Sequence, residues 1–199
     1  MNVLGVLFDS RLQWAQHVAN SIAKANKALS AIRLIKRYFN TRELLGLITS
    51  NFYSILYYNS EIWHLPTLKP QLKQLLMSAS GRAIKACSYK LDPGISFINL
   101  HKLNHRATPN KVMIYRHALL LYKLYNDRQP MTEWSHLNFQ HQFSMRRGHF
   151  TVAKTNTYKI GDNILVNRLS VLNNLIPRDW INLSYESYKI KMKEKFITC

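Results

Sequence analysis

The spacing of apolar residues along the chain predicts a mainly helical protein. Between residues 14 and 32, apolar side chains recur every third or fourth position, which places them on one stripe of a helix: Trp14, Val18, Ile22, Ala25, Leu29 and Ile32. Asp9 or Ser10 can cap this helix. Lys24, Lys27 and Arg37 fall outside the stripe, so we expect them to project away from the core. An ordinary solvated helix surface would show the same pattern.

An apolar run before this helix, Val3 to Phe8, predicts a short strand. A strand needs a neighbour to pair with its backbone N–H and C=O groups. We expect this neighbour either to come from far along the chain or to be missing. If it is missing, the open apolar edge favours self-association of the chain.

The same periodicity predicts further helices. A second begins at Asn40 or Thr41, where Asn40 and Glu43 form a capping-box pattern, and its apolar positions are Leu45, Ile48, Phe52, Ile55 and Ile62. A third covers residues 71–89, and a short helix or turn follows at 95–105. Another helix starts at Thr108-Pro109 and runs to Asp127. The last helices are expected from Asp162 and after a cap at Ser184.

We therefore divide the chain into four segments. Residues 1–64 hold the strand and the first two helices, and residues 65–127 form a helical connector. Residues 128–160 lack periodicity and predict a basic loop or arm, and residues 161–199 form a C-terminal helical segment.

The charge balance indicates a polyanionic partner. Lysine and arginine number 28 against 10 aspartate and glutamate, which gives a formal charge of +18. Nucleic acid is a commoner partner of such a domain than an anionic membrane. Scattered lysines from an AT-rich genome would account for part of this excess. The length of 199 residues and the 47% hydrophobic content exclude a disordered tail.

Two further groups of residues are candidates for contact with nucleic acid. Arg146 and Arg147 lie in the basic loop beside three histidines, where phosphate contact is the favoured interpretation. The second helix ends in aromatic residues that either stack on bases or, more commonly for such a stripe, belong to the core: Tyr53, Tyr57, Tyr58 and Trp63.

The residues indicate no catalytic, metal or cofactor site. No two of the ten carboxylates are neighbours at spacings of one, three or four, whereas two-metal phosphoryl transfer needs clustered carboxylates. His101 and His105 have the spacing of a metal clamp but lack a third ligand. We found no phosphate-binding or dinucleotide-binding motif.

The compartment expected from the sequence is intracellular, in the nucleus or cytoplasm. No apolar run approaches the roughly 18 residues that a membrane span needs, and no signal-peptide pattern is present. Cys87 and Cys199 make neither a disulfide framework nor a zinc pair. We expect no membrane partner.

Several motifs resemble the reverse transcriptases of non-LTR retrotransposons. "LGVLFDSRLQWAQHV" followed by "KANKALSAIRLI" is similar to the stretch that leads from the palm into the thumb, through Leu4, Gly5, Asp9, Leu12, Trp14 and His17. "FYSILYYNSEIW", "GRAIKAC", "KLNHRATPNKVMIYRHALLLYKLYNDRQP" and "NRLSVLNNLIPRDWINLSYESYKIKMKEKF" resemble later motifs in the same order. The chain departs from the pattern at Leu172, where tryptophan is usual, and at Ile176, which is inserted before Pro177.

The resemblance implies a thumb-like helical bundle. Its N-terminal strand would be left from a primer-grip hairpin, with Leu4, Gly5 and Val6 as primer-grip-like residues. The partner strand, the fingers and the catalytic palm are expected upstream of Met1, so the palm would be a missing partner. The family's thumb lies along the primer–template duplex, which implies that Lys24, Lys27 and Arg37 contact phosphates.

Three functions follow as hypotheses. The first is a non-catalytic remnant of the RNA-directed DNA polymerase that binds primer–template nucleic acid. The second is a domesticated basic helical protein that binds RNA or DNA alone. The third is an enzyme that complements a separate palm or acts as a nuclease. The scattered carboxylates disfavour the nuclease.

Overall fold

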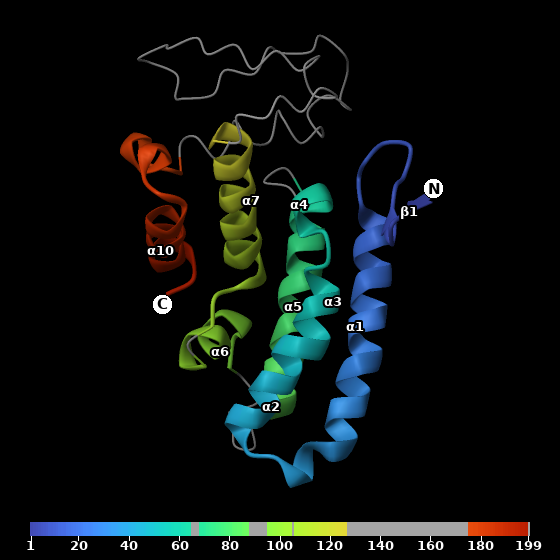
Figure 1. Ribbon diagram of the computed structural model, residues 1–199. Helices are drawn as coiled ribbons and strands as arrows, with labels where there is room; N and C mark the ends of the chain where they lie inside the picture. Colours follow the sequence, from blue (N-terminus) through green and yellow to red (C-terminus); the bar gives the residue numbers. More distant parts are fainter. Residues whose placement is uncertain (65–67, 88–94, 105, 127–174, 199) are drawn as a thin grey trace.

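The computed structural model describes residues 1–64, 68–87, 95–104, 106–126 and 175–198. These ranges fold mainly as helices after a short N-terminal hairpin, which confirms the expected fold class (Figure 1). α1 (Ala15–Ile35) lies along one side, and α7 (Pro109–Asn126) and α10 (Tyr185–Phe196) lie along the other. The helices of residues 41–87 pack between them.

The first residues form a complete hairpin. β1 (Asn2–Val3) pairs antiparallel with β2 (Val6–Leu7). Leu4 and Gly5 make the turn with φ of 47° and 82°, the two left-handed positions that a tight two-residue hairpin requires. Our expectation of one strand from Val3 to Phe8 is therefore wrong, because the glycine lets the apolar run fold back on itself.

This hairpin also corrects the premise of a missing neighbour. Met1 and Phe8 close its open end, where the Phe8 N–H donates to the Met1 carbonyl at 2.8 Å. Val6 is 1% exposed, and the Phe8 ring packs edge-on against Trp14 with the ring centroids 5.2 Å apart. The hairpin is thus attached to the helical core by its second strand, while Leu4 at the turn is 84% exposed. Self-association through this strand stays a prediction.

Asp9 closes a turn before α1 and does not cap the helix. Its carboxylate accepts hydrogen bonds from the backbone N–H groups of Arg11, Gln13 and Trp14, at 3.0, 3.0 and 2.7 Å. Burial alone would raise the pKa of Asp9, but these hydrogen bonds outweigh it and lower the pKa. Trp14 then starts the helix from a left-handed conformation, with φ 65°.

The apolar stripe of α1 faces the core as expected. Its buried members are Trp14, Val18, Ala25, Leu29 and Ile32, and Ile22 is partly buried against them. His17 is buried on the same face and accepts a hydrogen bond from the Leu7 N–H at its Nδ1, 3.2 Å away. Burial, and secondarily the charge of Lys24, lowers the pKa of His17. The side chain of His17 therefore ties the hairpin to the helix.

The second helix is divided into four pieces. α2 (Thr41–Leu47) begins with the expected capping box: the Asn40 side chain accepts from the Glu43 N–H at 3.0 Å, and the Glu43 carboxylate accepts from the Asn40 N–H at 2.8 Å. A π-helix, η2 (Ile48–Tyr53), and the short α3 (Ser54–Leu56) follow. After a turn at Asn59, which has φ 47°, α4 (Ser60–Trp63) ends the unit.

The wider turn of η2 changes which residues face inward. A π turn holds more residues than an α turn, so the apolar period shifts after it. Of the positions expected to face inward, Ile55 is only partly buried, and Ile62 is 40% exposed. The structure instead buries Tyr53, Leu56, Tyr57 and Trp63, which confirms the core interpretation for three of the four aromatic residues. Tyr58 is 51% exposed.

Further helices follow between residues 70 and 126. α5 (Pro70–Cys87) packs on α1, and α6 (Phe97–Leu103) packs on α5. The pair Thr108-Pro109 precedes the body of α7. One apolar core runs from Val6 of the hairpin to Met113 of α7, so the segments that we divided at residue 64 share it.

A second apolar cluster joins α7 to the C-terminal residues. η3 (Arg178–Asn182) leads to α10, whose cap at Ser184 is as expected. The buried members of this cluster are Ala118, Tyr122, Ile176, Tyr188, Met192 and Phe196. The Tyr188 hydroxyl donates to the Ala118 carbonyl at 3.0 Å. The basic loop expected at residues 128–160 and the helix expected from Asp162 lie outside the described residues.

Candidate nucleic-acid interface

The outer face of α1 carries cations without carboxylates. Between Asp9 and Glu43 the sequence contains no acidic residue, while its cations are Arg11, Lys24, Lys27, Arg33, Lys36, Arg37 and Arg42. The segment therefore produces a positive potential that its own side chains do not offset.

Lys24 and Lys27 form one local group. Both are exposed, and a spacing of three residues puts them about 60° apart around the helix and about 4.5 Å apart along its axis. Arg33 lies on the opposite flank, because nine residues rotate the helix by about 180° relative to Lys24. Lys24 and Lys27 are therefore spaced so that both could contact one phosphate backbone.

Arg37 lies beyond the end of α1, in the 3-10 turn η1 (Lys36–Tyr38). Its guanidinium donates to the Tyr38 hydroxyl at 2.5 Å, and its Cζ lies 4.7 Å from the centre of the Tyr38 ring. Tyr38 is 68% exposed, and the nearby Leu34 is 80% exposed. The end of this basic segment thus combines a cation with an exposed aromatic ring, which are the groups that stack on and neutralise a nucleic-acid strand.

The other expected site residues are not brought to this face. Leu4 and Gly5 form the exposed hairpin turn, whereas Val6 is buried, so these three residues do not make one primer-contacting edge. Arg146 and Arg147 lie outside the described residues.

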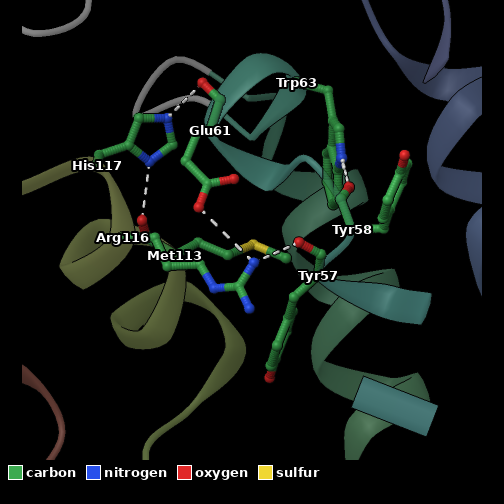
Figure 2. Close-up of polar contacts among 7 residues, drawn as sticks. All are labelled: Tyr57, Tyr58, Glu61, Trp63, Met113, Arg116 and His117. Carbon is green, nitrogen blue, oxygen red and sulfur yellow. Dashed lines mark hydrogen bonds and ion pairs between the residues drawn. The ribbon is translucent and has the colours of Figure 1, made fainter. Parts of the chain in front are cut away.

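A polar joint holds α7 against the α3–α4 turn (Figure 2). Arg116 donates to the Tyr57 carbonyl at 2.7 Å and lies 3.7 Å from the Glu61 carboxylate. The His117 ring lies between two carbonyl oxygens, Nδ1 2.8 Å from that of Met113 and Nε2 3.1 Å from that of Glu61. These contacts fix the direction in which α7 leaves the core.

Sequence reasoning missed a basic pocket that Tyr57 and Arg116 of this joint also line. The pocket measures about 1170 Å³. Four cations from three parts of the sequence line it: Arg42, Arg106, Arg116 and Lys193. Only the general excess of positive charge pointed to such a site, because tertiary packing alone brings the four together.

The candidate metal clamp is not assembled by the described residues. His101 is 1% exposed, and its Nε2 lies 3.1 Å from the Ser80 hydroxyl, which also contacts the Tyr53 hydroxyl at 2.6 Å. His105 lies outside the described residues. Within them, no three His, Cys, Asp or Glu side chains are placed to hold a metal ion.

Comparison with protein-family models, with curated proteins and with solved structures finds no match for the chain. The resemblance to reverse transcriptases is therefore supported by the sequence motifs alone. In the ranges that the structure describes, no helix has both the length and the apolar character needed to cross a bilayer.

Proposed function

We propose that this chain is a non-catalytic nucleic-acid-binding module, similar to the thumb and connector of a non-LTR reverse transcriptase. The outer face of α1 would hold the backbone of a primer–template duplex. The observation that carries the proposal is that Lys24, Lys27 and Arg37 are exposed along a segment without carboxylates. The motif resemblance also supports an α1 face that points towards the primer–template duplex.

Phosphate contacts by these cations would be independent of base sequence. Binding of this kind releases counterions, so it weakens steeply as salt rises, and typical affinities are about 10⁻⁴ to 10⁻⁶ M at physiological salt. Because α1 packs its opposite face on the core, the contacts would leave the fold unchanged. We expect no template-dependent nucleotide incorporation by the chain alone.

The test reverses the charge of Lys24, Lys27 and Arg37 together, each to glutamate. We expect weaker binding to every duplex sequence, and a log–log salt slope that is smaller by about one for each lost contact. The measurement is fluorescence anisotropy with a labelled RNA–DNA duplex at several salt concentrations.

A matched control reverses Arg82, Lys102 and Lys111, which are also exposed but lie on three different helices. The lysines of α10 serve less well, because Lys189 pairs with Glu186 at 3.5 Å and Lys191 lies over the Trp180 ring. Both triple variants change the net charge equally. If they lose equal affinity, the +18 charge acts diffusely and the proposed face is wrong.

The second candidate function is a domesticated RNA- or DNA-binding protein that acts alone on single strands. Exposure of the Tyr38 ring beside Arg37 favours it, because aromatic rings stack on unpaired bases. Tighter binding to single strands than to duplexes, lost in Tyr38→Ala, would support this candidate. Duplex preference unaffected by Tyr38→Ala would support the first.

A further inference from the structure

The basic pocket is built by helices from three parts of the chain. One wall is the face of α2 and η2 that carries Arg42, Gly46 and Tyr53 at helical spacings. The start of α7 forms another wall, and Lys193 of α10 lies at its edge. Its volume of about 1170 Å³ is ample for a small molecule, since such sites commonly measure about 300–1,000 Å³.

Two hydroxyl side chains at the π turn bond to backbone carbonyl oxygens of the same wall. Thr49 Oγ1 donates to the Leu45 carbonyl at 2.6 Å, and Ser54 Oγ donates to the Ser50 carbonyl at 2.5 Å, which satisfies oxygens along the distorted helix. Thr49 and Ser54 both line the pocket. The short hydroxyl side chains that accompany the π turn therefore also leave space for a ligand.

The charge of the pocket is positive and partly fixed in place. Its described lining includes Arg42, Arg106, Arg116 and Lys193 and no carboxylate. Arg106 donates to the Leu45 carbonyl at 3.0 Å and Arg116 to the Tyr57 carbonyl at 2.7 Å, so two guanidinium groups are oriented before any ligand arrives. Glu61, at 3.7 Å from Arg116, offsets only part of this charge.

Aromatic rings line the same space. The Tyr53 and Tyr57 rings stack with centroids 5.2 Å apart and planes at 16°, and the guanidinium carbons of Arg106 and Arg116 lie 5.9 and 5.7 Å from them. Burial raises the pKa of both phenols, so they stay neutral and do not cancel the cations. The Tyr57 hydroxyl is buried without a hydrogen-bond partner among the described residues. Tyr115 adds a third, partly buried ring.

We propose that this pocket binds one nucleotide unit, with its phosphate at the cations and its base against the aromatic and apolar wall. Guanidinium groups bind phosphate through directed hydrogen bonds, and flat rings accept a base by stacking. The nucleotide is either free or the phosphorylated end of a strand. The proposal is independent of duplex binding by α1.

Gly46 gives the sharpest test. It lines the pocket, and a Cβ added there meets nothing within 4 Å, so Gly46→Phe fills space without a clash at its Cβ. Gly46→Ala is the matched control, because it makes the same backbone change but adds only a methyl group. Thermal denaturation should show that both variants fold.

The probe is adenosine 5′-monophosphate, with binding measured by calorimetry. Adenosine and inorganic phosphate should each bind at least about tenfold more weakly, because each lacks one half of the contacts. Gly46→Phe should abolish binding of the nucleotide, and Gly46→Ala should retain it. The double variant Arg42→Gln/Lys193→Gln should weaken binding of the nucleotide but not of adenosine.

Binding of a phosphorylated oligonucleotide distinguishes a free nucleotide from the phosphorylated end of a strand as the ligand. If it binds in a manner sensitive to Gly46→Phe and the mononucleotide does not, the ligand is a strand end. The proposal is overturned if neither ligand binds, or if Gly46→Phe leaves their affinity unchanged. Reversal of Lys24, Lys27 and Arg37 should leave mononucleotide binding intact, and Gly46→Phe should leave binding of a blunt duplex intact, so each proposal can fail alone.

Discussion

Mild acid should destabilise the fold through His64. This residue is 1% exposed and packs between Trp63 and His117, with ring centroids 6.0 and 6.1 Å away. Burial, followed by the charges of His117 and Lys73, lowers the pKa of His64 to about 3. An unfolded chain returns this pKa to its ordinary value of 6.5.

The sign and size of the effect follow from proton linkage. Between pH 3 and pH 6.5 the unfolded chain binds a proton at His64 that the folded chain does not, so stability falls as the pH falls through this window. From pH 7 to pH 5, the loss from this one residue is about 2 kcal/mol. Burial also lowers the pKa of His17 and His101, so these residues act in the same direction. Asp9 contributes only at lower pH, because its pKa lies below 3.8.

Urea denaturation at pH 7 and pH 5 measures this loss. His64→Leu removes the titration, and the unpartnered Nδ1 of His64 among the described residues indicates that an apolar side chain is tolerated. We expect the variant to lose about 2 kcal/mol less than the wild type between the two pH values. Leu72→Ala, a core change without titration, should lower stability by about 2 kcal/mol at both. Equal pH-dependent losses in wild type and His64→Leu would refute the reasoning.

Two further predictions concern packing. Gly81→Ala should lower the free energy of unfolding by about 1–3 kcal/mol, because a Cβ at Gly81 would lie 2.0 Å from the Phe97 ring, so α6 would have to move away from α5; an unchanged urea midpoint would contradict this contact. Deletion of residues 1–8 should lower the melting temperature, because it removes the buried Val6, whose burial alone is worth about 1.5 kcal/mol; an unchanged melting temperature with better solubility would restore the idea of an unpaired strand.

Local signals in the sequence predicted the structure well. The capping box of Asn40 and Glu43, the cap at Ser184 and the stripe on α1 all depend on residues within a turn or two of each other. Such interactions form whatever the rest of the chain does, so the sequence pattern contains the information needed to place them. Lys24 and Lys27 were correctly placed on the exposed face for the same reason.

The π turn could not be read from apolar spacing. It adds a residue to one turn, so the period before Ile48 and the period after Tyr53 belong to different faces. The run Thr49-Ser50-Asn51 is the available signal, since these side chains donate to carbonyls four residues back. Each of these residue types is common on helices, which makes the signal weak.

The sequence analysis predicted neither the hairpin nor the pocket, and the reasons differ. Gly5 is a turn signal, but the apolar residues on both sides of it read as one strand when a distant partner is assumed. The pocket depends on tertiary packing, which places residues of α2, α7 and α10 around one space. No spacing in the sequence indicates that Arg42, Arg116 and Lys193 line the same pocket.

The two basic features meet at the corner between η1 and α2. Arg37 lies just after α1 and Arg42 lines the pocket, and the five residue steps from one to the other span at most about 18 Å. The capping box at Asn40 fixes this corner, so a long polyanion can reach both features at once. Gly46→Phe changes the volume of the pocket and no charge, so it is the substitution whose effect can be assigned to the pocket alone.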